Sequence, residues 1–165
     1  MTHEKWLEIV QNRKAETKMI RPATIQDASR IAEISIFTKR MNYRSIFHND
    51  EVSFGEMQVY PLAKEYIEHP EDLNGIWVYE ESFVKGFLHI NGLRIEELYV
   101  DSFFQNQGIG GKLIEFAIKH CGCKSLWVLE KNTSAIRFYR RHGFYESGQR
   151  RSEDGTDEYN LEMIR

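Results

Sequence analysis

The sequence contains few of the residues that mark secreted, fibrous or disulfide-stabilised proteins. Its 165 residues include only 2 cysteines, 3 prolines and 11 glycines. Cys121 and Cys123 are separated by one residue and cannot build a disulfide framework, so we expect free thiols in a reducing compartment. We also expect no metal site, because structural zinc sites usually combine two pairs of ligands. The low glycine and proline content excludes a fibrous or linker-dominated protein.

Two further absences bear on partners. No uninterrupted apolar run approaches the roughly 18 residues of a membrane span, and the first residues lack the apolar core of a signal peptide. The 22 basic and 25 acidic residues give a net charge of −3, without the basic excess that dominates nucleic-acid binding. We therefore expect a cytoplasmic protein that has no membrane or nucleic-acid partner.

The residues that are present suffice for one hydrophobic core. Hydrophobic residues make up 41% of the chain and aromatic residues 13%. A chain of this length corresponds to about one domain and buries roughly 70% of its unfolded surface. We expect this domain at residues 18–165. Residues 1–17 are expected to form a helical extension, because Trp6, Ile9 and Val10 lie on a rough helical stripe. A homodimer is left open.

Apolar periodicity and turn residues predict an alternating order of strands and helices. Thr24 and Asp27 form a variant of the capping box that begins a helix. Asp154-Gly155 is a strong hairpin dipeptide. The predicted helices are residues 24–43, 59–67, 108–121 and 133–141, with an irregular segment at 44–57. The predicted strands are residues 19–22, 76–79, 84–90, 95–100, 125–129, 144–149 and 158–163. This order indicates an α/β or α+β fold with a mixed sheet.

A glycine-rich turn connects the strand at residues 95–100 to the next helix. Free backbone amides at a helix N-terminus attract anions, and glycines let a phosphate approach the backbone closely. A Walker A loop is excluded, because Leu113 follows Gly111-Lys112 and Asn106 stands where the first glycine should be. A dinucleotide fingerprint is excluded because Leu113 also occupies its third glycine position. The turn therefore predicts a phosphate or pyrophosphate ligand, with a purely structural tight turn as the alternative.

Two motifs resemble those of one family. Gln105-x-x-Gly108-x-Gly110 is similar to the acetyl-coenzyme A (acetyl-CoA) pyrophosphate loop of the GCN5-related N-acetyltransferases (GNAT superfamily). Residues 132–144, Asn-Thr-Ser-Ala-Ile-Arg-Phe-Tyr-Arg-Arg-His-Gly-Phe, resemble its second signature, Asn-x-x-Ala-x-x-Phe-Tyr-x-x-x-Gly-Phe, at every fixed position. The resemblance covers residues 19–163. It implies a mostly antiparallel sheet containing a splayed parallel strand pair. It also implies direct acetyl transfer from acetyl-CoA to a primary amine of a small molecule or peptide.

The resemblance also implies roles for particular residues. The amide of Val100, or of a neighbouring residue, would polarise the thioester carbonyl. The Tyr139 phenol would protonate the departing thiolate, because its usual pKa of about 10 is close to that of an alkyl thiol. Asn132 would contact the cofactor, cap the following helix, or do both. The implied cofactor-binding residues are Leu98, Tyr99, Val100, Gln105, Asn106, Gln107, Gly108, Ile109, Gly110, Gly111, Lys112, Asn132, Ala135 and Tyr139.

The general base is where this chain departs from the family. Arg94 stands where family members often have a glutamate, so the candidates are Glu96, Glu97 or a water chain. We favour Glu96. Side chains of a regular strand alternate between the two faces of the sheet, but a β-bulge at Glu96-Glu97 would interrupt this alternation, so it cannot decide between the two glutamates. The missing glutamate also supports an alternative function, a non-catalytic acyl-CoA sensor. Residues 40–60 are expected to line the acceptor side. Polyamine, amino acid, antibiotic and protein N-terminus all remain candidate acceptors.

Overall fold

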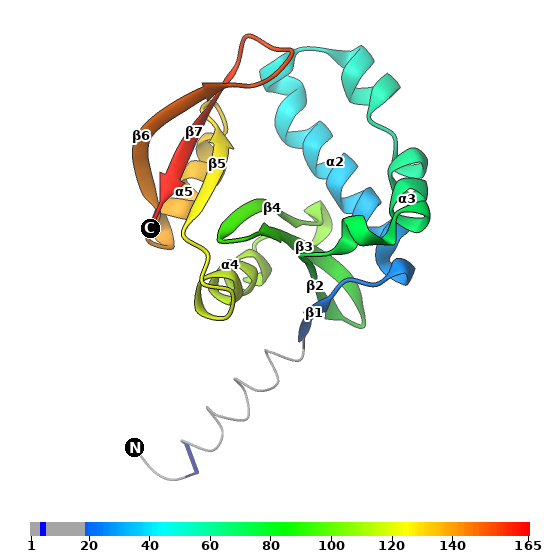
Figure 1. Ribbon diagram of the computed structural model, residues 1–165, viewed down its shortest axis with the longest axis vertical. Coiled ribbons are helices and arrows are strands. Elements are labelled where there is room, and N and C mark those ends of the chain that lie inside the picture. Colours follow the sequence, from blue (N-terminus) through cyan, green and yellow to red (C-terminus); the bar gives the residue numbers. More distant parts are fainter. Residues whose placement is uncertain (1–3, 6–18) are drawn as a thin grey trace.

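The computed structural model describes residues 4–5 and 19–165 (Figure 1). The predicted N-terminal extension lies outside the described residues except for Glu4 and Lys5. The described strands are β1 (Ile20–Pro22), β2 (Ile76–Glu81), β3 (Phe83–Asn91), β4 (Arg94–Val100), β5 (Ser125–Leu129), β6 (Tyr145–Ser152) and β7 (Tyr159–Ile164). The longer helices are α2 (Ala28–Phe47), α3 (Val59–Glu68), α4 (Ile109–Lys119) and α5 (Thr133–Arg141). Among these residues, no helix has the length and apolar character to cross a bilayer.

The described strands form one open sheet of seven strands in the order β1-β2-β3-β4-β5-β7-β6. Every neighbouring pair is antiparallel except β4 and β5, which are parallel. The predicted mixed, mostly antiparallel sheet flanked by helices is therefore confirmed. The capping box is also present, because the Thr24 amide donates to Asp27 Oδ2 at 2.8 Å before the short helix Ile25–Asp27.

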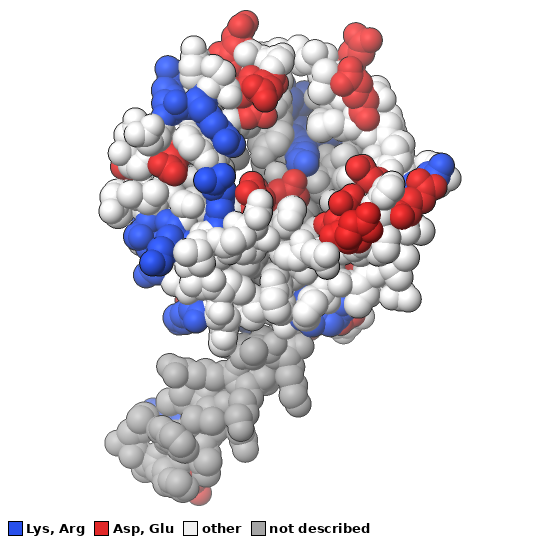
Figure 2. Space-filling model, viewed as in Figure 1, with Lys and Arg blue, Asp and Glu red and all other residues white. Residues whose placement is uncertain are grey.

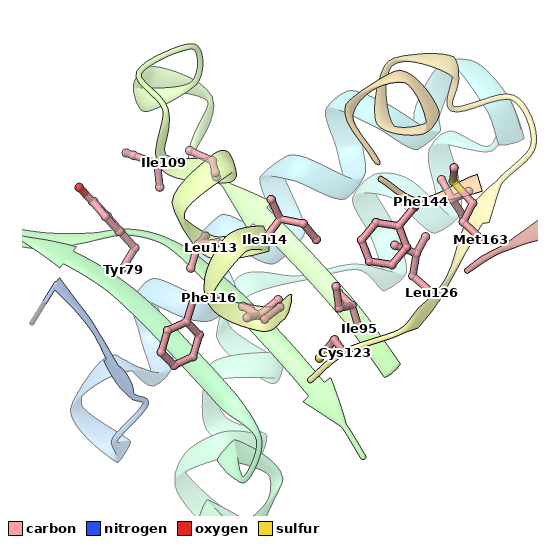
Figure 3. Close-up of a cluster of buried hydrophobic side chains, with 14 of the residues drawn as sticks. Tyr79, Ile95, Ile109, Leu113, Ile114, Phe116, Cys123, Leu126, Phe144 and Met163 are labelled. Atoms are coloured by element: carbon pink, nitrogen blue, oxygen red, sulfur yellow. The ribbon is translucent and has the colours of Figure 1, made fainter. Parts of the chain in front are cut away.

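Buried side chains form two clusters. The larger one contains Leu113 and Ile114 of α4 with Ile95 of β4 and Leu126 of β5 (Figure 3). The other cluster contains Ile31 and Ile34 of α2 with side chains of β2 and β3. α4 and α2 thus contribute to different cores, and the sheet separates them (Figure 1). Consecutive side chains of a strand point to opposite faces, which is why one sheet supplies both cores.

One predicted segment differs from the structure. Residues 44–57, expected to be irregular, contain the last turn of α2 and the short helix Glu51–Glu56. α2 continues to Phe47 because Ile46 is buried, and it ends at His48 in a left-handed conformation with φ of 50°. Arg44 then holds Asp50 at 2.7 Å across this turn. Burial of Ile46 in the folded protein therefore extends α2 beyond the predicted end, where polar residues hide the helical spacing of apolar residues.

The parallel pair β4–β5 separates soon after it begins. Only Arg94 with Ser125 and Ile95 with Leu126 are paired. On the other side of β4, His89 pairs with Glu97 and Ile90 with Ile95, which leaves Glu96 as the extra residue of a β-bulge. The bulge expected near Glu96 and Glu97 is therefore present. Such a bulge bends its strand, and β4 leaves β5 at this point.

Candidate functional site

A cavity of about 930 Å³ lies where β4 and β5 separate. The space-filling view shows a hollow in this face, with acidic and basic side chains in and around it (Figure 2). Most of the predicted site residues come together in its walls. These are Glu96, Leu98, Tyr99, Val100, Gln105, Asn106, Gly108, Ile109, Gly110, Gly111, Asn132, Ala135 and Tyr139. Gln107 and Lys112 are not in the walls, and the Lys112 ammonium lies 5.7 Å from the centre of the Tyr79 ring.

The glycine-rich turn presents unpaired amides to this cavity. Gly108 caps α4 with φ of 83°, a left-handed conformation that glycine adopts without steric cost. The first helical bond runs from the Lys112 amide to the Gly108 carbonyl at 3.1 Å. Within the described chain, the amides of residues 109–111 have no main-chain acceptor. These amides and the helix dipole together can hold a phosphate.

The Gln105 side chain fixes the start of this loop. Its Nε2 donates to the Val100 carbonyl at 3.1 Å, so the turn is tied back to the end of β4. The glutamine at the first position of the motif therefore has a structural role in shaping the loop. A rigid loop keeps its free amides aligned before any ligand arrives.

Gly110 is required for packing between helices. A side-chain carbon added at Gly110 would lie 3.3 Å from Cε2 of Phe138 on α5, which is closer than an ordinary contact. At Gly111, the nearest atom to such a carbon is His142 Nε2 at 3.7 Å, which is an ordinary contact. The second motif glycine thus lets α5 approach α4 closely, and α5 carries Tyr139.

The free edge of β4 provides polar groups at the point of separation. The Asp101 amide donates to the Lys85 carbonyl of β3 at 2.9 Å. Main-chain groups of successive strand residues point to alternate sides, so those of Val100 and Leu98 point away from β3. That side is the gap left by β5. The Val100 amide is therefore oriented as an oxyanion donor would need to be.

Asn132 is the N-cap of α5. Its Oδ1 accepts from the Ala135 amide at 3.3 Å and from the Ser134 hydroxyl at 3.2 Å. The capping role considered from the sequence is therefore present. Asn132 and Ala135 also line the cavity, so contact with a bound ligand remains a prediction.

Three phenols converge on the cavity from different elements. The hydroxyls of Tyr43 on α2 and Tyr99 on β4 are 3.1 Å apart, and Tyr139 of α5 lies near them. Burial raises the pKa of Tyr139, and with the nearby Tyr43 it keeps this phenol protonated at neutral pH. Burial likewise raises the pKa of Tyr43 and Tyr99. Nothing in the sequence indicated the Tyr43–Tyr99 pair, because its members are 56 residues apart.

The two candidate bases have different surroundings. Glu96 is exposed on the bulge and has no hydrogen-bond or ion-pair partner among the described residues. Glu97 forms an ion pair with Lys39 of α2 at 3.2 Å, and their side chains are only 23% and 27% exposed. Both carboxylates line the cavity. Glu97 is therefore held by an ion pair, and Glu96 is not.

The remaining walls include residues that the sequence did not single out. They come from α2 and from β5, β6 and β7, and they include Lys39, Asn42, Trp127, Arg151, Glu153 and Asn160. Tyr43 and Phe47, within the segment expected on the acceptor side, also line the cavity. No local pattern marks these side chains, because sheet pairing brings them together.

Comparison with protein families agrees with this architecture. Residues 72–146 match the family model described as an acetyltransferase (GNAT) domain. This segment includes β4, the glycine-rich turn and α5. The match covers 75 of the 165 residues, and over this segment the chain is similar to GNAT acetyltransferases.

Similar curated proteins share only part of their length with this chain. The peptidyl-lysine N-acetyltransferase YjaB of Salmonella typhimurium is 33% identical over 76 residues, which are 46% of this chain and 52% of that protein. A probable spermine N(1)-acetyltransferase of Bacillus subtilis subsp. natto is 31% identical over 61 residues, 33% of this chain and 40% of the relative. The chain thus spans about half, or less, of the length of these two relatives.

Solved structures share the fold over a larger region. The apo form of YjaB from Escherichia coli superposes with a TM-score of 0.71 at 19% identity, covering 88% of this chain and 95% of that one. The PaiA N-acetyltransferase of Thermoplasma acidophilum, solved with coenzyme A, has a TM-score of 0.60 at 20% identity, covering 88% and 98%. At these identities, the likeness establishes the fold.

Proposed function

We propose that this protein transfers an acetyl group directly from acetyl-CoA to a primary amine. The observation that carries the proposal is one cavity that joins three features. These are the unpaired amides of residues 109–111, the free edge of β4 and the Tyr139 phenol. The named activities of YjaB and the spermine acetyltransferase, and the coenzyme A bound to PaiA, support the same cofactor and an amine acceptor.

The cofactor would follow the chain from the helix to the strand. Its pyrophosphate binds the amides of residues 109–111. Its pantetheine amides pair with the main-chain groups of Leu98 that β5 leaves free. The thioester carbonyl then accepts from the Val100 amide, which stabilises the negative charge that develops on its oxygen.

The chemistry requires two proton transfers. Glu96, or Glu97 in its place, removes a proton from the acceptor ammonium, directly or through water. The free amine attacks the thioester carbon, so a C–N bond forms and the C–S bond breaks. Tyr139 donates its proton to the departing thiolate and recovers one from the acceptor nitrogen or solvent. Burial raises the pKa of Tyr139, so its phenol still carries its proton when the thiolate departs.

Release of free thiol tests this proposal. The full chain is incubated with acetyl-CoA and a panel of amines, and thiol release is followed together with mass analysis of the amine. We expect thiol release that depends on the amine, together with acetylated product. The experiment overturns the proposal if no amine on a broad panel yields acetylated product.

The alternative is a non-catalytic acyl-CoA sensor on the same fold. Arg94, which stands where the family often has a glutamate, favours it. The sensor predicts that coenzyme A raises the melting temperature while no thiol is released with any amine. Stabilisation together with turnover would exclude it.

A further inference from the structure

We propose that the acceptor carries a carboxylate beside its amine, and that Arg151 on β6 binds this carboxylate. The acceptor class is then amino acids and related amino-carboxylates. The inference rests on the acetyltransferase function proposed above and names its substrate class.

Arg151 is exposed and lies over an indole ring, and no hydrogen bond of its side chain is found within the described part of the chain. Its guanidinium carbon lies 4.3 Å from the centre of the Trp127 ring, and both residues line the cavity. No carboxylate in the described part of the chain pairs with Arg151, whereas its neighbour Arg150 holds Glu130 at 2.7 Å. The N–H groups of a guanidinium lie in one plane, and stacking on an aromatic ring leaves them free. Two of them can then donate parallel hydrogen bonds to the two oxygens of a carboxylate. Arg151 is thus oriented for a ligand that the protein itself does not supply.

Three other charged side chains of these walls have partners within the protein. Lys39 pairs with Glu97, and Glu153 accepts a hydrogen bond from Asn160. Arg141 of α5 lies by the Phe138 ring and has no carboxylate partner among the described residues. Outside α5, Glu96 and Arg151 are the two charged wall residues with neither an ion pair nor a side-chain hydrogen bond in the described part of the chain.

Strand pairing brings Glu96 to the part of the sheet where Arg151 lies over an aromatic ring. β4 and β5 are last paired at Ile95 and Leu126, so Glu96 and Trp127 are the next residues on the separating strands. Arg151 covers the same Trp127 ring from β6. The Trp127 indole N–H is buried and has no protein partner, which adds a donor to this wall. An ammonium beside Glu96 and a carboxylate beside Arg151 complete this arrangement.

The same arrangement disfavours a purely cationic acceptor. A polyamine carries no group for Arg151, and a second ammonium placed beside Arg151 would be repelled by its positive charge. Specificity between charged ligands depends on such repulsion as much as on attraction. We therefore expect a preference that differs from the polyamine named for one relative.

Matched pairs of acceptors test the inference. Lysine against cadaverine, ornithine against putrescine and phenylalanine against phenethylamine each differ by one carboxylate. We expect kcat/KM for the carboxylated member to exceed that of its partner by roughly tenfold or more in at least one pair. Arg151→Ala should abolish this advantage and leave the dissociation constant of acetyl-CoA unchanged. Arg151→Lys, which keeps the charge and loses the fork, should restore only part of it.

Arg150→Ala is the matched control and should retain the wild-type preference, because Arg150 already pairs with Glu130. The inference is overturned if the decarboxylated amines are equal or better acceptors in all pairs, or if Arg151→Ala keeps the preference. Failure of the acetyltransferase function is a separate outcome, seen as no turnover with any amine. In that case, calorimetric titration of the coenzyme A-loaded protein with the same pairs decides the carboxylate site. Arg151-dependent binding of the carboxylated members supports it, and its absence excludes it.

Discussion

Gly110 on α4 and Phe138 on α5 are packed so closely that a side-chain carbon at Gly110 would have to displace the Phe138 ring by a few tenths of an ångström. A carbon at Gly110 would approach the Phe138 ring to 3.3 Å. The second motif glycine therefore also determines how near α5, with Tyr139, comes to the glycine-rich turn. A change at Gly110 should act through this helix contact as well as through the turn.

Gly110→Ala should lower the free energy of unfolding by about 1–2 kcal/mol, because Phe138 must move out of its packing position. Gly111→Ala is the control, since its added carbon meets only an ordinary contact at 3.7 Å and alanine favours the helix. Denaturant unfolding of both variants measures the difference. Equal stabilities would contradict the role of the Gly110–Phe138 contact.

Tyr139→Phe should lower kcat by about a hundredfold and leave the affinity for acetyl-CoA nearly unchanged, because only the proton donor is lost. The variant should also fold normally, since the Tyr139 hydroxyl has no hydrogen-bond partner among the described residues. Tyr145→Phe on β6, whose residue is 58% exposed, is the matched control and should behave like wild type. Steady-state kinetics and cofactor titration separate the two effects. A fully active Tyr139→Phe would reject the role as acid.

Glu96→Gln should reduce kcat/KM near neutral pH and move the rise of the pH–rate profile to higher pH. Without a base, the rate follows the fraction of free amine, which increases toward the amine's own pKa of about 10. Glu97→Gln should mainly release Lys39, its partner at 3.2 Å. Full pH profiles of both variants decide between them. If only Glu97→Gln shows the shifted profile, Glu97 is the base and the preference for Glu96 is wrong.

Asp27 should make stability sensitive to acid. Burial alone would raise the pKa of Asp27, but hydrogen bonds from Arg21 and Thr24 outweigh it and lower the pKa below its usual value. The lowered pKa means that the stabilisation is present above the unfolded value of about 3.9 and is lost as pH falls through the folded value. The wild type should therefore lose stability below about pH 4.

Asp27→Asn should cost about 2 kcal/mol at pH 7 and flatten this acid dependence, because the 8% exposed side chain both caps the helix and neutralises Arg21. Glu80→Gln is the comparison, since Glu80 also pairs with Arg21 at 2.7 Å but is 41% exposed, and its loss should be smaller. Unfolding at several pH values checks both. An unchanged acid dependence in Asp27→Asn would contradict the prediction.

Short-range sequence patterns predicted the local elements and the position of the glycine-rich turn. β5 and α5 have the predicted bounds, and the helix after Gly108 begins at the next residue. Apolar periodicity, caps and glycines act within a few residues, so these features can be predicted from short stretches of chain. The resemblance of two motifs extended this to the fold and to most of the cavity walls.

The set of charges and phenols that share the cavity depends on contacts between residues far apart in the chain. The bulge at Glu96 interrupts the alternation of side chains along β4. The sequence pattern therefore could not tell which face of the sheet carries Glu96 and which carries Glu97. The Tyr43–Tyr99 contact and the Arg151–Trp127 stack join residues far apart in the chain. Such contacts depend on strand register and on the separation of β4 from β5, which no local pattern of residues specifies.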